Sequence, residues 1–292
     1  MLPALVPYWA PQVVQLGPIP IDPWATLVCI GFVVGLEVAR ARGIKMGLDT
    51  RDVVDGALFI VGLGFVVGHL VHVIAYNPDQ MNDPETGQFA VGTAAIALAK
   101  IWAGFSSNGG FLGAVLGTLL FYKVVRKRDF WQFADNAMYG FPFGYIFGRL
   151  GCFSVHDHIG LKAEALPWLS FLAVDFPKPL GPRFDVALIE ALWLVVVALI
   201  FFVVNRRWEG SHGKFIALWC MTYAPVRFLL DFMRNTDLDG ADARYLGLTP
   251  AQYGALAMFT AGCLIVWRLW TRRSSQVHAE SPEDSATVDA SS

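Results

Sequence analysis

Long apolar runs recur along this chain and constrain its fold more than any other feature. A helix needs about 20 apolar residues, within a range of roughly 17 to 25, to cross the ~30 Å hydrocarbon core of a bilayer. Because lipid offers no partners for backbone N–H and C=O groups, such runs cross as helices. The sequence predicts seven spans, at residues 24–39, 53–76, 109–125, 133–150, 185–204, 215–232 and 251–270.

The composition agrees with a membrane protein. Hydrophobic residues make up 55% of the chain and charged residues only 16%, against about 25% charged in soluble domains. We therefore predict an all-α polytopic membrane protein. Residues 1–273 form one transmembrane domain with a polar arm between the fourth and fifth helices, and residues 274–292 form a disordered cytoplasmic tail.

Lysine and arginine gather in alternate loops and predict the orientation. They concentrate at residues 40–51, 123–128, 206–214 and 268–273, and short loops rich in these residues stay cytoplasmic. We expect the N-terminus outside and the C-terminus inside. The net charge of −2, with most basic residues in these short loops, argues against a nucleic-acid partner.

Several polar side chains inside or beside the predicted spans lie toward the outer leaflet. Ionisable groups within a bilayer are costly, so they mark functional sites and need partners. The direction of each predicted span places the following residues at the same outer leaflet: His69, His72, Asn108, Arg149, Glu190, Arg227, Asp231 and Arg234.

Two interpretations of the sixth span are open. Arg227, Asp231 and Arg234 are spaced i, i+4 and i+7, which predicts one helical face. They could neutralise one another while their stems reach the interface. Alternatively, arginines from different helices surround a lipid phosphate, which guanidinium groups bind bidentately.

An ordered set of motifs resembles the prolipoprotein diacylglyceryl transferase family. The resemblance covers about residues 15–270 with all seven spans in order. It rests on Asp135, on Pro142-Phe143-Gly144, on Gly148-Arg149-Leu150-Gly151, and on the run from Tyr223 through Arg227, Asp231 and Arg234 to Asp237.

The resemblance implies a reaction and a place for it. Such enzymes transfer the diacylglyceryl group of phosphatidylglycerol to the lipobox cysteine thiol of a preprolipoprotein and release glycerol 1-phosphate. They use no metal or organic cofactor. The resemblance implies a multi-pass protein of the bacterial inner membrane with its active site toward the periplasmic leaflet, and the expected partners are phosphatidylglycerol, the lipobox peptide and the bilayer.

The resemblance also implies roles for individual residues. Arg149 and Arg227 match essential arginines of the family and would hold the phosphate, while Asp157 and Asp231 stand at acidic catalytic positions. The further lipid-binding residues that we expect are Tyr223, Arg234, Asn108, Gly109, Gly110 and Glu190.

The sequence departs from the family where a proton must be accepted. The family's His-Gly-Gly at the start of the third span is Asn108-Gly109-Gly110 here, and asparagine cannot accept a proton. Cys152 stands where the family has asparagine. The alternatives to the transferase are therefore a divergent paralogue with a different acceptor, a metal-dependent chemistry, and a lipid-binding protein without catalysis.

Four histidines admit three interpretations. They could line a helix contact and face water without a chemical role. His156 or His158, oriented by Asp157, could replace the missing base, since imidazole ordinarily accepts a proton near neutral pH. Alternatively, the histidines could hold zinc or iron with nitrogen ligands, and the residues of that site are His69, His72, His156 and His158.

Overall fold

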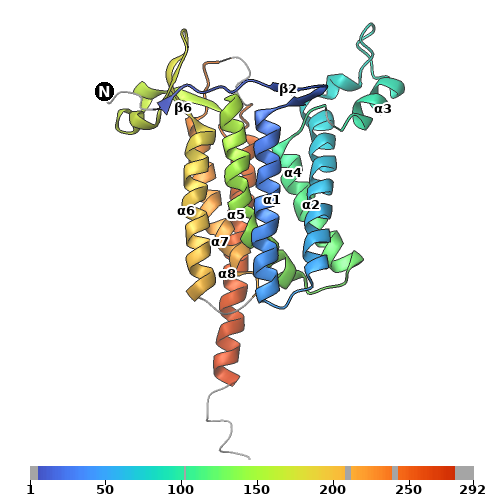
Figure 1. Ribbon diagram of the computed structural model, residues 1–292, viewed down its shortest axis with the longest axis vertical. Coiled ribbons are helices and arrows are strands. Elements are labelled where there is room, and N and C mark those ends of the chain that lie inside the picture. The colour runs from blue at the N-terminus through green and yellow to red at the C-terminus, as the bar shows by residue number, and fades with distance from the viewer. Residues whose placement is uncertain (1–5, 102, 208–211, 239–242, 280–292) are drawn as a thin grey trace, which may run out of the picture.

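Long helices run side by side in the computed structural model, with short strands gathered at one end, here named the strand end (Figure 1). The structure describes residues 6–101, 103–207, 212–238 and 243–279. The α-helices in these ranges are α1 (Pro23–Lys45), α2 (Thr50–Val71), α3 (Val91–Ala99), α4 (Ser107–Leu119), α5 (Phe130–Val155), α6 (Val186–Arg207), α7 (Lys214–Leu230) and α8 (Pro250–Ala279).

Six helices of the described chain are long and apolar enough to cross a bilayer, which confirms an all-α polytopic membrane fold. They are α1, α2 with the π-helical turn His72–Tyr76, α4 with the π-helical turn Leu120–Val125, α6, α7 with the 3₁₀ turn Asp231–Met233, and α8. The remaining predicted span lies within α5, whose 26 residues extend about 39 Å. Helix α5 carries the polar residues Asp135, Asn136 and Arg149. It packs against α1, α6 and α7.

Glycines allow α1 and α5 to pack with their backbones almost in contact. A Cβ atom on Gly144 would collide with the carbonyl oxygen of Gly31, and one on Gly140 would collide with that of Gly35. Small residues commonly permit such close helix contacts in membranes. The contact fixes the position of α5, and with it the arginine that follows Gly144 by five residues.

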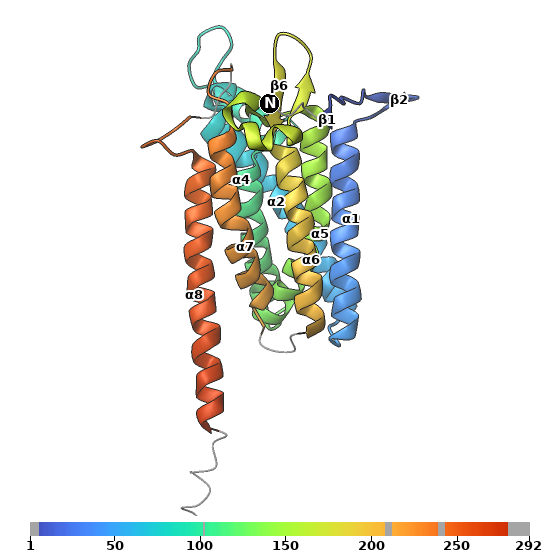
Figure 2. The ribbon, with the colours of Figure 1, turned by 90° about the vertical axis from the view of Figure 1, so that its left-hand side faces the viewer.

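The polar arm between α5 and α6 contributes three strands to a small sheet at the strand end, which the sequence analysis did not predict (Figures 1 and 2). The strand order is β1 (Val6–Pro7), β5 (Val174–Phe176), β6 (Gly181–Asp185) and β4 (Ile159–Lys162). Strand β1 pairs with β5 in parallel, and the other pairs are antiparallel. A separate hairpin joins β2 (Val14–Leu16) and β3 (Ile19–Ile21). The short 3₁₀ helices of the loops are Pro78–Met81, Ala163–Ala165 and Pro167–Leu172.

A buried polar cluster ties four helices together at the opposite end of the bundle. Asp135 of α5 accepts hydrogen bonds from the backbone N–H groups of Phe215 and Ile216, at 2.7 and 3.3 Å, and so caps the start of α7. Arg42 of α1 lies 3.7 Å from Asp135 and donates to Asn205 of α6 at 3.0 Å. The motif residue Asp135 therefore joins helices far from the strand end.

Helix α8 extends to Ala279, so residues 274–279 of the predicted tail continue the helix. Residues 280–292 of that tail lie outside the described residues. The sidedness of the two termini stays a prediction.

Candidate functional site

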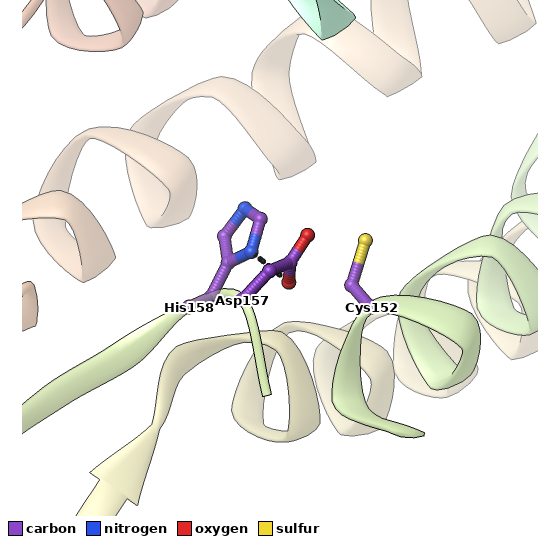
Figure 3. A group of neighbouring side chains, drawn as sticks. All are labelled: Cys152, Asp157 and His158. Atoms are coloured by element: carbon purple, nitrogen blue, oxygen red, sulfur yellow. Dashed lines mark hydrogen bonds and ion pairs between the residues drawn. The ribbon is translucent and has the colours of Figure 1, made fainter. Parts of the chain in front are cut away.

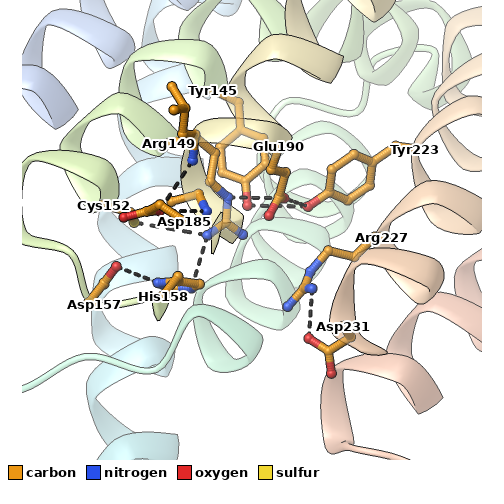
Figure 4. Close-up of polar contacts among 12 residues, drawn as sticks. Tyr145, Arg149, Cys152, Asp157, His158, Asp185, Glu190, Tyr223, Arg227 and Asp231 are labelled. Carbon is orange, nitrogen blue, oxygen red and sulfur yellow. Dashed lines mark hydrogen bonds and ion pairs between the residues drawn. The ribbon is translucent and has the colours of Figure 1, made fainter. Parts of the chain in front are cut away.

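A buried carboxylate, Glu190 in the first turns of α6, lies at the centre of a polar cluster at the strand end (Figure 4). Its Oε1 atom lies 3.0 Å from Nε of Arg149 and accepts a hydrogen bond from the hydroxyl of Tyr223. Its Oε2 atom is buried and has no hydrogen-bond partner among the described residues. Glu190 thus connects α6 with α5 and α7.

Arg149 lies near the end of α5 with only 5% of its surface exposed. Its guanidinium carbon lies 5.0 Å from the centroid of the Tyr145 ring, a cation–π contact. Its Nη1 atom lies 3.2 Å from Nε2 of His158. The guanidinium is thus contacted by the carboxylate of Glu190, the ring of Tyr145 and the imidazole of His158.

Arg227 approaches the same carboxylate from α7. Its Nη1 donates to Oδ1 of Asp231 at 2.8 Å, the i, i+4 pair that the spacing predicts. The other carboxylate oxygen of Asp231 accepts a hydrogen bond from the hydroxyl of Thr249, the residue before α8. The guanidinium of Arg227 turns toward Asp231 (Figure 4), and the carboxylate of Glu190 interacts electrostatically with both Arg149 and Arg227.

Two guanidinium groups from two helices therefore flank one buried acid. Among the described residues, Nη2 of Arg149 and both Nε and Nη2 of Arg227 make no hydrogen bond. Each guanidinium carries five N–H donors in a fixed plane, and such groups match the oxygens of phosphate and carboxylate. The two guanidinium groups are therefore the candidate anion-binding groups of this site.

Asp157 and His158 form a second polar pair beside Arg149. The Nδ1 atom of His158 is hydrogen-bonded to Oδ1 of Asp157. Because a guanidinium can only donate, Nε2 of His158 accepts from Arg149 and Nδ1 carries the hydrogen that Asp157 accepts. This hydrogen-bond pattern places the lone pair of the His158 ring on Nε2.

The sequence matches the family model described as prolipoprotein diacylglyceryl transferase over residues 11–268. The chain belongs to this family. It is 32% identical over 267 residues to a protein of Vibrio parahaemolyticus, covering 88% of this chain and 90% of that protein. It is 30% identical over 238 residues to one of Pasteurella multocida, covering 79% and 81%. Both relatives are named phosphatidylglycerol–prolipoprotein diacylglyceryl transferase, so the resemblance found in the motifs is confirmed.

Asn108 lies in the first turn of α4. Its exposed side chain donates to the hydroxyl of Tyr76 at 2.8 Å. Phe111, one turn further along α4 on the same face, packs against Tyr145 with ring centroids 5.8 Å apart. Tyr145 also contacts the guanidinium of Arg149. Phe111 therefore connects α4 with the residues around Arg149.

Gly109 and Gly110 were expected to bind lipid, but the structure gives them packing contacts. A Cβ atom on Gly109 would come too close to Val71 and Gly68 of α2, and one on Gly110 would come too close to the ring of Phe105. These glycines let α4 pack tightly against α2 and against the loop that precedes α4. A direct contact with lipid at either residue stays a prediction.

His156 faces away from the arginines, unlike His158. Its Nδ1 lies 2.8 Å from Oδ2 of Asp185, and its Nε2 lies 3.1 Å from the carbonyl oxygen of Trp9. The ring also stacks on Tyr8, with centroids 4.7 Å apart. Both ring nitrogens therefore contact protein oxygens, so neither faces a substrate. The geometry favours His158 over His156 as the base.

The four histidines of the predicted metal site are not gathered around a common centre. His69 is fully buried, and its ring nitrogens each lie 3.0 Å from a carbonyl oxygen, of Gly104 and of Ala97. Its ring centroid is 6.4 Å from that of His72. His69 thus holds the connection between α3 and α4, and the structure gives it a packing role.

Arg234 does not share a helical face with Arg227 and Asp231, because α7 ends at Leu230. Residues Asp231–Met233 form a 3₁₀ turn, and Arg234 is extended, with φ −66° and ψ 145°. Its backbone forms an isolated antiparallel bridge with Gly160 of β4. The i+7 part of the predicted face is wrong because the helix stops before that position.

Sequence reasoning missed three residues that support the site. Tyr145 precedes Arg149 by four residues, so helical spacing could have placed it beneath the guanidinium. Asp185 and Thr249, which hold His156 and Asp231, come from separate segments of the chain. No local pattern in the sequence links them to their partners.

Proposed function

We propose that this protein transfers the diacylglyceryl group of phosphatidylglycerol to the lipobox cysteine of a preprolipoprotein and releases glycerol 1-phosphate. The observation that carries the proposal is the pair Arg149 and Arg227, which come from different helices and flank Glu190 in a chain of this family. Relatives from Vibrio and Pasteurella bear the name of this activity.

The two arginines act on the phosphodiester of the lipid. The cysteine sulfur attacks the glyceryl carbon that carries the phosphate, an S–C bond forms, and the C–O bond to phosphate breaks with its electrons passing to oxygen. Negative charge therefore grows on the departing glycerol phosphate. Fixed donors that face this charge stabilise the transition state, and Arg149 and Arg227 supply them. Glu190 and Tyr223 position Arg149, and Asp231 positions Arg227.

His158 accepts the thiol proton in this proposal. A free cysteine has a pKa of about 8.5, so a base is needed to form thiolate at neutral pH. Asp157 fixes the imidazole with its lone pair on Nε2, beside Arg149. When Arg149 turns its Nη1 to a phosphate oxygen, Nε2 becomes available to the incoming thiol.

The site lies toward the periplasmic leaflet of the bacterial inner membrane. Arg149, Glu190, Arg227 and His158 all lie at the strand end, where α5 and α7 finish and α6 begins (Figures 2 and 4). The loops rich in lysine and arginine lie at the opposite end of the bundle, which the positive-inside rule assigns to the cytoplasm. An exported lipobox peptide would meet the lipid at this face.

A transfer assay with detergent-solubilised protein, phosphatidylglycerol and a lipobox peptide tests the proposal. Arg149→Ala and Arg227→Ala should each lower the rate of thioether formation by about 100-fold or more, because each removes a fixed donor. Arg149→Lys should also be impaired, since an ammonium cannot bind bidentately. Arg40→Ala is the matched control, because Arg40 is exposed and pairs with Glu37 in α1. Near wild-type rates in the Arg149 and Arg227 variants would contradict the proposal.

Binding of phospholipid without chemistry is the second candidate, and Asn108 favours it because an amide cannot replace the family histidine as a base. The same assay separates the two. Wild-type protein that binds phosphatidylglycerol but forms neither thioether peptide nor glycerol 1-phosphate would establish the binding function instead.

A further inference from the structure

Three side chains of different chemistry converge at the end of α5. Cys152 lies in the last turn of α5, and Asp157 and His158 follow in the next turn (Figure 3). A sulfur, a carboxylate oxygen and an imidazole nitrogen from these residues all lie within 4.8 Å of one another. Among the described residues, these three form a group of histidine, cysteine and acidic side chains that could hold one metal ion.

We propose that Cys152, Asp157 and His158 bind a thiophilic divalent cation such as Zn²⁺, and that the bound metal inhibits the protein. Thiolate, imidazole and carboxylate are the ligands that zinc takes in proteins, at about 2.0–2.3 Å. Bonds of this length place tetrahedral ligands roughly 3.3–3.7 Å apart, so ligand atoms as far as 4.8 Å apart have to approach. The hydrogen bond between Asp157 and Nδ1 of His158 has to open before both side chains can bind one ion. Asp157 can turn out of this hydrogen bond, because 44% of its side chain is exposed.

The backbone around the cluster is fixed before any metal binds. His156 adopts a left-handed conformation, with φ 50°, and reverses the chain so that Asp157 and His158 return toward Cys152. Its ring is buried and bonded to Asp185 and to the carbonyl oxygen of Trp9. The turn is therefore anchored to β6 and to the N-terminal segment, which reduces the entropy that metal binding would lose.

The cluster already holds a positive group. Nη1 of Arg149 lies 3.2 Å from Nε2 of His158 and 3.9 Å from the sulfur of Cys152 (Figure 4). A metal ion at the three ligands would repel this guanidinium, which lies within 4 Å of both His158 and Cys152. The inhibitory part of the inference rests on the proposed function, because the metal would remove both the phosphate donor and the base from the reaction.

Cobalt titration of the purified full-length protein, freed of metal by a chelator, tests the binding. Co²⁺ should bind at one equivalent per chain with a thiolate-to-cobalt absorption band, and Zn²⁺ should displace it. Cys152→Ser should abolish the band, and Asp157→Asn should weaken binding by about ten- to a hundredfold. Cys263→Ser is the matched control, since Cys263 is an exposed thiol on α8. A wild-type protein without the band, or a band that persists in Cys152→Ser, would overturn the site.

Inhibition is measured separately in the transfer assay. Zn²⁺ should lower the wild-type rate at concentrations that fill the cobalt site, while Cys152→Ser should keep most of its own metal-free rate. Binding without inhibition would refute the inhibitory role. If the wild-type protein shows no transfer at all, the proposed function fails, yet the cobalt titration still decides whether the metal site exists.

Discussion

Arg149 has three kinds of partner, and each limits where its guanidinium can lie. Glu190 attracts Nε, Tyr145 supports the flat face, and His158 accepts from Nη1. Leaving a buried cation unpaired costs about 3–5 kcal/mol, so these contacts are required even without a ligand. The arrangement places the charged guanidinium of Arg149, a group suited to bind an anion, within a largely apolar bundle.

His158 is the residue that most directly tests how the thiol loses its proton. His158→Ala should lower the transfer rate by about 10² to 10⁴-fold at neutral pH, the usual contribution of a general base. The loss should shrink as pH rises toward the thiol pKa of about 8.5, because solution then forms the thiolate. A pH–rate profile of both proteins measures this.

Two other substitutions complete that experiment. His212→Ala, at an exposed residue just before α7, should leave the profile unchanged. Asn108→His should add little if His158 is the base, because the proton already has an acceptor. A large gain from Asn108→His together with full activity in His158→Ala would place the base at the start of α4 instead.

Residues that carry the site were partly predictable from the sequence. Arg149 and Arg227 stood out because a charge within an apolar span needs a function or a partner. The difference between His156 and His158 was not predictable, because it depends on one left-handed residue and on contacts with Asp185 and Trp9.

The element that positions Arg149 is α5, and its contact with α1 depends on the absence of side chains. Gly144→Ala would place a methyl group against the carbonyl oxygen of Gly31. Overpacking of this kind costs about 1–3 kcal/mol, so the variant should melt at a lower temperature in detergent. It should also transfer more slowly, since Arg149 lies on the same helix.

Gly62→Ala provides the comparison for that variant. A Cβ atom on Gly62 of α2 would meet no atom within 4 Å, so this change should leave stability and transfer close to wild type. Equal melting temperatures for the two variants would show that the α1–α5 contact tolerates separation.

A second element-scale contact links the sheet to the chain after α7. Arg183 of β6 donates to both carboxylate oxygens of Asp237, at 3.0 and 2.5 Å. The hydrogen bond from Arg183 lowers the pKa of Asp237 from its ordinary value of 3.8. The contact is therefore fully formed above the ordinary pKa and is lost as pH falls through the lowered one.

Hydrogen exchange of the β4 and β6 amides should detect this contact. At neutral pH, Asp237→Asn should exchange faster than wild type, and the difference should disappear once the pH falls below the lowered pKa. Asp175→Asn, at an exposed residue of β5, is the control. Identical exchange in wild type and Asp237→Asn at neutral pH would exclude a stabilising role for the ion pair.

Elements of different length were predictable to different degrees. The long helices followed from apolar runs because the bilayer requires about 20 residues per crossing. The strands of the four-stranded sheet have only two to five residues and are paired across distant segments, so the sequence showed only a polar arm. The end of α7 at Leu230 was also missed, since the apolar and charged spacing continues beyond it.

At the scale of the whole molecule, one end of the bundle carries the polar chemistry and the other holds the helices together. Asp135 and Arg42 tie α1, α5, α6 and α7 at the end opposite the strands. Arg149, Glu190 and Arg227 come from α5, α6 and α7 at the strand end. Three helices that are fixed at one end thus converge on the proposed anion site at the other.

The most direct test of this account is an experimental structure of the protein with phosphatidylglycerol bound. Both Arg149 and Arg227 should donate hydrogen bonds to oxygens of one phosphodiester, at about 2.7–2.9 Å, with Nε2 of His158 facing the glyceryl carbon. A lipid phosphate bound by only one of these arginines, or bound elsewhere on the molecule, would contradict the account.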